Sequence, residues 1–324
     1  MTMLTRNNRS RFDGATALVT GSSRGLGLAV AERLAERGAR LSICARDEQA
    51  LDRAAERLRA RGADVLTIAG DLTDDGACEE AVARTRERYG GIDLLVNNAG
   101  QIQVGPLSAV GEAEFRSAME LMYFAPLQLT LAALPSMRES RGTIVNITSL
   151  GGRTAAPHLL PYVGAKFALT GLSEGLRAEL AGTGVSVTTV VPGLMRTGSH
   201  LGAEFRGRTT REYAWFATAA ALPLLSISAE HAAEKVVRAA ERRRPDVVLG
   251  ATAQVATRMH GLAPATTTRA LTTAARLLDT WTTPTDTSTR RETGAEAARR
   301  LDSRVVGAIT TLNDKAARRL GNAN

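Results

Sequence analysis

A phenol and an amine one helical turn apart are the groups in this sequence best placed to move a proton. Tyr162 and Lys166 stand at positions i and i+4, so they share one face of a predicted helix. An ordinary phenol has a pKa of about 10, and a nearby ammonium should lower that value. Ser149 ends a predicted strand shortly before them, and its hydroxyl could orient a carbonyl oxygen. These three residues predict acid–base catalysis at a carbonyl or alcohol carbon.

A glycine-rich turn upstream predicts a site for a nucleotide. Gly21, Gly25 and Gly27 follow a short apolar run directly and open an amphipathic helix. Small residues there let the backbone turn sharply, so that a pyrophosphate can approach the N–H groups at the start of the helix. The spacing is G-x-x-x-G-x-G instead of the more usual G-x-G-x-x-G. The prediction therefore depends on the strand–turn–helix context, and the alternative is a plain structural turn.

Two arginines near this turn favour NADP(H) over NAD(H). Arg24 lies within the turn, and Arg46 follows the second predicted strand. An enzyme that selects NAD usually places a carboxylate there to bind the ribose 2′-hydroxyl, whereas Ala45 is neutral. Two guanidinium groups would instead bind a 2′-phosphate. The alternative for Arg46 is a solvated residue at the start of a helix, beside Asp47.

Two further strand ends carry polar or small residues. The Asp71 carboxylate could accept a hydrogen bond from an adenine amino group, cap the next helix, or do both. Asn97 and Asn98 could tie neighbouring strands together. The Ala99 and Gly100 that follow leave room for a ribose.

These motifs are positioned by an alternation of strands and helices that runs to about residue 250. Short apolar runs predict buried parallel strands at Ala15–Thr20, Ala39–Ala45, Asp64–Ala69, Ile92–Val96, Thr143–Thr148, Val185–Val191 and Asp246–Leu249. Amphipathic stretches predict helices at Leu26–Arg37, Glu48–Arg61, Asp74–Tyr89, Glu112–Arg138, Leu159–Ala181 and Ala229–Arg243. The pattern predicts an α/β fold with a doubly wound parallel sheet and helices on both faces. The ligand is then expected at the carboxyl ends of the strands.

The composition predicts a folded, soluble protein. Hydrophobic residues make up 44% and charged residues 23% of the chain. The two cysteines, Cys44 and Cys78, form neither a disulfide framework nor a metal-ligand pattern, so we expect no metal and a reducing cytoplasm. The basic N-terminal arm, residues 1–12, lacks the apolar stretch of a signal peptide. The net charge of +8 comes from arginines interleaved with acidic residues, so no nucleic-acid partner is expected.

Taken in order, the motifs resemble the short-chain dehydrogenase/reductase family over about residues 13 to 250. The resemblance adds Pro192, Gly193 and Thr197, whose family counterparts cover the nicotinamide. It implies a Rossmann-like seven-stranded sheet of order 3-2-1-4-5-6-7, a cofactor that delivers a hydride, and Tyr162 as proton donor in ketone reduction. It also implies a homodimer or homotetramer built on the two long helices. The residues expected to bind NADP(H) are Gly21, Ser23, Arg24, Gly25, Leu26, Gly27, Arg46, Asp71, Leu72, Asn98, Ala99, Gly100, Tyr162, Lys166, Pro192, Gly193 and Thr197.

One position departs from the family's pattern. Met122 stands where the family has an asparagine, which helps to hold a water that links the lysine to solvent. A thioether is a weak acceptor and cannot replace an amide. Three outcomes are open: a relay through backbone and water, slowed turnover, or an NADP(H)-binding regulatory or scaffold protein of low or no redox turnover. We favour an active enzyme because Ser149, Tyr162 and Lys166 are all present.

A segment at about residues 195–226 is expected to form the substrate lid. Its apolar side chains predict a lipophilic carbonyl or alcohol substrate, with a β-ketoacyl thioester as the nearest alternative. They could equally pack the lid onto the core: Phe205, Tyr213, Trp215, Phe216, Leu222, Leu224 and Leu225. His158 and His200 are expected to be incidental to the site.

Residues 251–324 predict a helical C-terminal extension. Helices are expected around Thr267–Trp281 and Ala295–Leu320, joined by a flexible linker at Thr282–Thr293. We expect the extension to pack on the domain, in preference to capping an oligomer interface or touching an anionic membrane surface.

Overall fold

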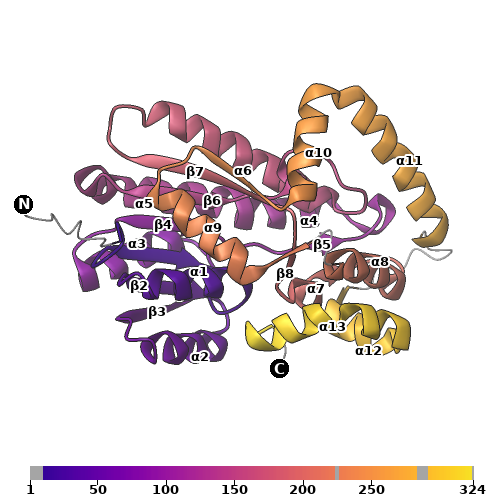
Figure 1. Cartoon of the computed structure of the whole chain (residues 1–324), viewed down its shortest axis with the longest axis horizontal. Coiled ribbons are helices and arrows are strands. Elements are labelled where there is room, and N and C mark those ends of the chain that lie inside the picture. The colour runs from indigo at the N-terminus through magenta and orange to yellow at the C-terminus, as the bar shows by residue number, and fades with distance from the viewer. Residues whose placement is uncertain (1–9, 223–225, 283–290, 323–324) are drawn as a thin grey trace, which may run out of the picture.

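Seven parallel strands form the central sheet of the protein, which is described by a computed structural model (Figure 1). The strands are β1 (Thr16–Thr20), β2 (Arg40–Ala45), β3 (Val65–Ala69), β4 (Leu94–Asn97), β6 (Thr143–Ile147), β7 (Ser186–Pro192) and β11 (Asp246–Leu249). Their order is β3-β2-β1-β4-β6-β7-β11. When only these strands are counted, the order is the predicted 3-2-1-4-5-6-7, so the predicted fold class is confirmed.

The structure describes residues 10–222, 226–282 and 291–322. Several predicted features therefore lie outside the described residues: positions 1–9 of the N-terminal arm, Leu224 and Leu225 of the lid, and positions 283–290 of the linker. Within the described ranges, no helix combines the length and the apolar character needed to cross a bilayer.

Helices cover both faces of the sheet. On one face, α1 (Gly25–Ala35), α2 (Glu48–Arg59) and α9 (Ala229–Glu241) contribute to a shared apolar core. On the other face, the core includes residues of α3 (Ala77–Tyr89), α5 (Ala125–Ser140) and α6 (Leu160–Glu179). Strands β1, β6 and β7 are buried along their whole length, because a sheet covered on both sides has no polar face.

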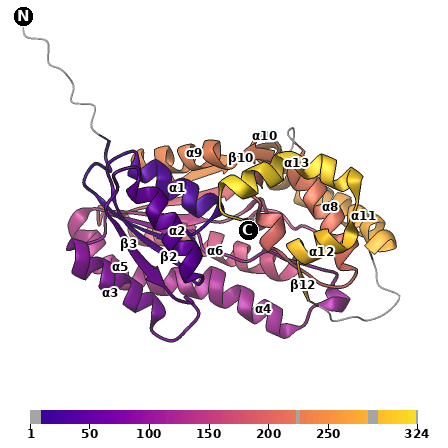
Figure 2. The same ribbon diagram turned by 90° about the horizontal axis from the view of Figure 1, so that it is seen from below.

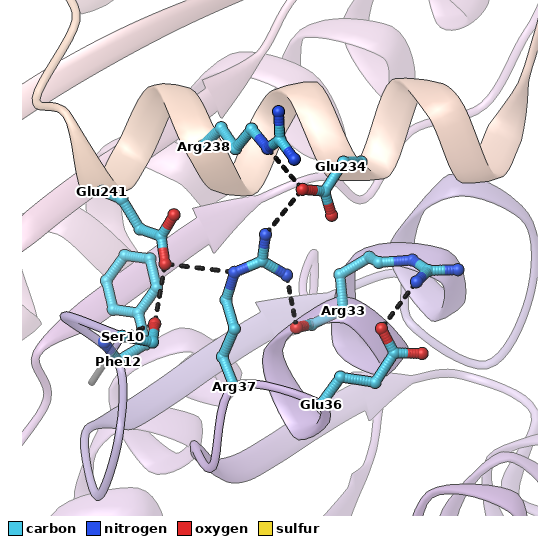
Figure 3. Close-up of polar contacts among 8 residues, drawn as sticks. All are labelled: Ser10, Phe12, Arg33, Glu36, Arg37, Glu234, Arg238 and Glu241. Atoms are coloured by element: carbon cyan, nitrogen blue, oxygen red, sulfur yellow. Dashed lines mark hydrogen bonds and ion pairs between the residues drawn. The ribbon is translucent and has the colours of Figure 1, made fainter. Parts of the chain in front are cut away.

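Polar contacts join the segment after α1 and the end of the N-terminal arm to α9 (Figure 3). Arg37 donates from Nη2 to Glu234 Oε1 at 2.8 Å and from Nε to Glu241 Oε1 at 3.1 Å. Ser10 Oγ donates to the same oxygen of Glu241 at 2.7 Å, and Phe12 beside it is buried in the core. The end of the predicted N-terminal arm is therefore part of the packed domain.

The long helix predicted at Glu112–Arg138 is interrupted by a π-helical turn. Helix α4 (Glu112–Met119) leads into η2 (Glu120–Phe124), and α5 follows directly. Pro126 explains the change, because it has no N–H to donate to the carbonyl of Met122 and its ring would clash with that carbonyl in an α-helix. Met122 itself is fully buried within this turn.

The lid region combines short strands with two helices. They are β8 (Leu194–Arg196), α7 (Ser199–Gly202), β9 (Glu204–Phe205), α8 (Thr209–Ala221) and β10 (Ser226–Ser228). Strand β8 pairs with β10, and β9 pairs with β5 (Gln103–Val104), which follows β4. The two ends of the lid are therefore paired with each other, and β9 ties the lid to the domain.

The C-terminal extension is more regular than predicted. It contains α10 (Ala251–Leu262), α11 (Pro264–Thr282), β12 (Glu292–Thr293), α12 (Gly294–Leu301) and α13 (Arg304–Arg319). The single helix predicted at Ala295–Leu320 is wrong, because Asp302 takes a left-handed φ of +40° and Ser303 caps a new helix. The end of the predicted linker is strand β12, which pairs antiparallel with β9. In Figure 1, α10 and α11 rise above the lid helices, and α12 and α13 lie below them.

Candidate active site

The glycine turn has the shape that a phosphate site requires. Gly21 and Gly25 have left-handed φ values of +61° and +60°. A Cβ on Gly27 would overlap the carbonyl oxygen of Gly21 and lie 2.5 Å from the side-chain amide of Asn98. Helix α1 can therefore begin this close to β1 only because glycine occupies that position. The start of a helix offers N–H groups to a phosphate, although here the N–H of Gly25 donates to the carbonyl oxygen of Leu320 at 3.0 Å.

Contacts from the end of β4 hold the turn in place. The Asn98 side chain donates to the carbonyl oxygen of Thr20 at 2.9 Å and to that of Gly21 at 3.1 Å. The Thr20 hydroxyl accepts from the backbone N–H groups of Asn98 and Ala99, both at 3.0 Å. Thr20 was not among the predicted site residues, although its place at the carboxyl end of β1 was a usable signal.

Arg46 and Asp71 meet at one end of the site. Arg46 Nη1 lies 3.5 Å from Asp71 Oδ2, and the Arg46 side chain is largely exposed. Burial alone would raise the pKa of Asp71, but hydrogen bonds from Thr73 and the Arg46 guanidinium outweigh it and hold that pKa below its usual value. The predicted capping of the next helix by Asp71 is wrong, because α3 has Gly76 as its N-cap. Asp71 instead caps the local turn at Thr73.

The predicted catalytic side chains lie together. The Ser149 hydroxyl is hydrogen-bonded to Tyr162, and its oxygen also accepts from the N–H of Gly151 at 3.0 Å. Lys166 is buried, and its Nζ donates to the carbonyl oxygen of Ile147 at 2.8 Å. The same nitrogen lies 5.8 Å from the centre of the Tyr162 ring. Helix α6 and the end of β6 therefore bring the three residues to one point.

Burial controls the protonation of both titratable groups. It raises the pKa of Tyr162, against the lowering effect of the hydrogen bond from Ser149. It lowers the pKa of Lys166 to about 8. The predicted lowering of the Tyr162 pKa by Lys166 is therefore wrong, because removing the phenol from water opposes the phenolate more strongly. Tyr162 is held as a phenol, the form that donates a proton in carbonyl reduction.

Met122 lies beside Lys166, the predicted catalytic lysine. A Cβ on Gly100 would lie 3.3 Å from Met122 Sδ and 3.6 Å from Lys166 Nζ, so the sulfur and the amine border the same space. Met122 packs with Ala118 and Ala165 in a small apolar cluster. Met122, which stands where the family has an asparagine, therefore lies in apolar surroundings next to the Lys166 amine.

A cavity of about 810 Å³ joins all of these groups. It runs past the Arg46–Asp71 pair, the glycine turn and the three side chains predicted to be catalytic. The other predicted cofactor-binding residues that line it are Ser23, Arg24, Leu26, Leu72, Asn98, Ala99, Gly100, Pro192, Gly193 and Thr197. Gly27 packs beneath the turn and is not part of the lining. A glycine cradle at the middle and basic and acidic side chains at one end fit a dinucleotide.

The lid presents few of its aromatic residues to this cavity. Phe216 lines it, whereas Phe205 and Tyr213 do not and are buried in the apolar cluster that also contains Phe216. The Trp215 ring packs against that cluster and donates from Nε1 to Glu212 Oε2 at 2.7 Å. Most of the predicted pocket wall therefore packs the lid onto the domain.

Two histidines join the lid to the C-terminal extension. His158 lies 2.8 Å from Glu212 Oε1 through Nδ1 and 3.0 Å from Asp279 Oδ1 through Nε2. Burial alone would lower the pKa of His158, but the two carboxylates outweigh it and raise that pKa. His200 Nε2 lies 3.2 Å from Asp314 Oδ1. Neither histidine lines the cavity, so both are structural links outside the site.

The extension also supplies cavity walls that the sequence did not indicate. Met259 of α10, Leu271 of α11 and Asn322 after α13 all line the cavity. The sequence pattern of the extension predicts helices, but it does not indicate which face of each helix lines a cavity.

Comparison with known proteins agrees with this arrangement. Residues 15–203 match the family model described as short chain dehydrogenase. The granaticin polyketide synthase putative ketoacyl reductase 1 of Streptomyces violaceoruber is 38% identical over 184 residues, which cover 56% of this chain and 68% of that protein. A putative ketoacyl reductase of Streptomyces coelicolor is 35% identical over 188 residues, which cover 57% of this chain and 72% of that protein.

Two solved structures share the fold. L-sorbose reductase from Gluconobacter frateurii, complexed with NADPH and L-sorbose, superposes with a TM-score of 0.67 and 26% identity, covering 75% of this chain and 97% of that one. A short-chain dehydrogenase from Streptomyces avermitilis gives a TM-score of 0.69 and 32% identity, covering 81% of this chain and 97% of that one. The family model matches more than half of the sequence. The chain therefore belongs to the short-chain dehydrogenase family of NAD(P)-dependent oxidoreductases.

Proposed function

We propose that the protein is an NADP(H)-dependent reductase of a lipophilic carbonyl compound, with the corresponding secondary alcohol as product. The proposal rests above all on Ser149, Tyr162 and Lys166, which line the same cavity as the glycine turn. Two relatives are named as putative ketoacyl reductases, and one structural neighbour was solved with NADPH. These likenesses support the reaction class and the choice of cofactor.

The side chains divide the chemistry of reduction among them. When bound, the nicotinamide would supply a hydride to the carbonyl carbon. Ser149 would donate a hydrogen bond to the carbonyl oxygen and hold it beside Tyr162. Tyr162 would pass its proton to that oxygen as negative charge develops there, which completes the alcohol and leaves a phenolate. Protonated Lys166, close to the ring, would stabilise the phenolate.

The remaining cavity wall supports a lipophilic substrate. Apolar side chains from the domain, the lid and the extension line it: Ile102, Leu121, Leu150, Met195, Phe216, Met259 and Leu271. Such a surface favours an extended apolar group over a sugar or a small acid.

A screen of NADPH consumption tests the proposed reaction. Lipophilic ketones, aldehydes and ketoacyl thioesters would be offered with NADPH, and with NADH in parallel. We expect consumption with at least one apolar carbonyl compound and a preference for NADPH. Tight cofactor binding without consumption of either nucleotide across the panel would contradict the proposal.

The Arg46 guanidinium is expected to select the 2′-phosphate. In Arg46→Ala, we expect Kd for NADPH to rise about tenfold or more, the effect of one lost charge-assisted hydrogen bond, with Kd for NADH little changed. Fluorescence titration with both nucleotides measures the effect. Arg116→Ala is a matched control, because Arg116 is also exposed and paired with a carboxylate but does not line the cavity. Equal losses of affinity for NADPH and NADH would show that Arg46 does not bind the 2′-phosphate.

A second candidate function is an NADP(H)-binding regulatory or scaffold protein with little turnover. Met122 favours it, because an apolar thioether lies beside Lys166 where the family has an amide. Under our main proposal, Met122→Asn should raise kcat by about tenfold or less, since the amine gains one polar neighbour. Met122→Leu is the control that removes sulfur without adding an amide. A wild-type protein that binds NADPH without turnover, and gains activity only as Met122→Asn, would favour the second function.

We also propose that the protein is a homodimer or homotetramer. Several large apolar side chains on and beside the two long helices are exposed: Phe124, Leu131, Leu160 and Phe167. Burying them between subunits would remove this apolar surface from water.

A further inference from the structure

The last described segment of the chain lies across the cofactor cavity. We define the C-terminal strap as α13 together with Leu320–Asn322. The carbonyl oxygen of Leu320 accepts from the N–H of Gly25 at 3.0 Å. The side-chain amide of Asn322 donates to the carbonyl oxygen of Thr197 at 2.6 Å. The strap therefore binds directly to the glycine turn and to the segment after β7, two of the segments that line the cavity.

Packing on the lid holds the strap in this position. Ala317 and Leu320 are fully buried, and a Cβ on Gly198 would overlap Ala317, so the strap helix lies directly on the lid backbone. Asn313 Oδ1 accepts from the N–H of Gly198 at 3.1 Å. The strap is thus anchored to the lid and also touches the turn.

Contacts with α2 and α9 hold the other side of the strap. Arg57 of α2 donates to the carbonyl oxygen of Arg319, and the Arg319 side chain forms an ion pair with Glu230 of α9. Figure 2 shows α13 running from the lid towards α1 and α2. The strap therefore spans from the lid to helices α2 and α9.

The strap covers the cavity without filling it. Asn322 is part of the lining of the same cavity that reaches the Arg46–Asp71 pair and the catalytic residues. Leu320 accepts a hydrogen bond from the N–H of Gly25, whereas the N–H of Leu26, which lines the cavity in the first turn of α1, has no intrahelical partner by position. Space and a hydrogen-bond donor for a pyrophosphate therefore remain under the closed strap.

We propose that the C-terminal strap is a gate on the dinucleotide site. It must release Gly25 and Thr197 for the cofactor to enter or leave, and it closes over the phosphates afterwards with Asn322 facing them. This inference rests on the cofactor assignment in the proposed function, but it needs no turnover to be tested.

A reversible crosslink between strap and turn tests the gate. A Cβ on Gly321 would lie 3.7 Å from the Cβ of Arg24, a separation that a disulfide spans, so Arg24→Cys combined with Gly321→Cys can lock the strap. Native Cys44 and Cys78 are buried and do not compete. NADPH association and displacement would be followed by stopped-flow fluorescence, with NADH in parallel. The reduced form of the same protein is the matched control, because it shares the loss of Arg24 and the strain at Gly321.

We expect oxidation to slow both association and release at least tenfold, and a reductant to restore both rates. Protein loaded with NADPH before oxidation should crosslink as readily and trap its nucleotide. Equal rates of NADPH association and release in the oxidised and reduced forms would contradict the gate but not the cofactor assignment. Failure of the NADPH-loaded protein to form the crosslink would do the same. Absence of NADPH and NADH binding to the wild-type protein would overturn the cofactor assignment and the gate with it.

A milder variant tests the strap without a crosslink. Asn322→Ala removes the hydrogen bond to Thr197, and we expect NADPH release to quicken about fivefold, the effect of one neutral hydrogen bond. Leu312→Ala is the control, because this α13 side chain is half exposed and does not line the cavity. If NADPH release were unchanged in Asn322→Ala, or equally faster in both variants, Asn322 would not contribute to the gate.

Discussion

Replacing Tyr162 with phenylalanine is expected to lower kcat for carbonyl reduction by about a hundred- to ten-thousand-fold. The substitution removes the proton that the carbonyl oxygen would receive and keeps the ring, so the cavity wall stays intact. Burial raises the pKa of Tyr162, so at neutral pH the wild-type residue carries that proton. NADPH consumption with the best substrate of the screen measures the loss, and fluorescence titration should show NADPH binding little changed.

Tyr123→Phe is the matched control for this prediction. Tyr123 lies in the π turn and does not line the cavity, so losing its hydroxyl should leave kcat within a factor of about two. If Tyr162→Phe retained activity within tenfold of the wild type, the proton would have to come from another group. Ser149 would then be the first candidate, because its hydroxyl is already hydrogen-bonded to Tyr162.

Gly27→Ala is expected to abolish dinucleotide binding and to destabilise the fold. The new Cβ would overlap the carbonyl oxygen of Gly21, which is rigid backbone that cannot rotate away, and it would press on the Asn98 amide that braces the turn. Overpacking of this kind typically costs about 1–3 kcal/mol, and a backbone clash lies at the upper end of that range. Urea denaturation measures the loss of stability, and NADPH titration measures the loss of binding.

Gly175→Ala provides the comparison. Gly175 lies within α6, and a Cβ there would meet nothing within 4 Å. Adding a methyl group to such a helix position should stabilise the protein by up to about 1 kcal/mol and leave NADPH binding unchanged. A Gly27→Ala protein that bound NADPH as well as Gly175→Ala would mean that the turn does not form the phosphate site.

The sheet could be predicted from the sequence because its signals are local and agree with one another. A strand such as Val187–Val191 reads as a continuous apolar and β-branched run, and its burial on both faces requires such a run. The glycine turn could also be predicted, from its context between a strand and a helix, and the spacing of Tyr162 and Lys166 places them on one helix face. The structure then brings them to a common cavity, as the doubly wound topology requires.

The contacts of the C-terminal extension and the pKa of Tyr162 could not be predicted from the sequence in this way. The amphipathic pattern of residues 304–319 predicts a helix, but its contacts with Gly198 and Gly25 depend on packing between segments far apart in the sequence. The Tyr162 pKa was mispredicted because the charge of Lys166 is visible in the sequence, whereas the burial that outweighs it is a property of the folded site. The π turn at Met122, in contrast, had a local signal in the sequence, because Pro126 has no N–H to donate to the carbonyl of Met122.

The hydrogen bond between Gly25 and Leu320 joins two segments that lie far apart in the sequence, and this has a consequence for biosynthesis. The contact can form only after Leu320 has been synthesised, whereas β1, α1 and the rest of the sheet can pair earlier. On a ribosome, we therefore expect the dinucleotide site to form open and to close only after the strap has emerged. A nucleotide that bound the nascent domain before then would favour its folded state by mass action.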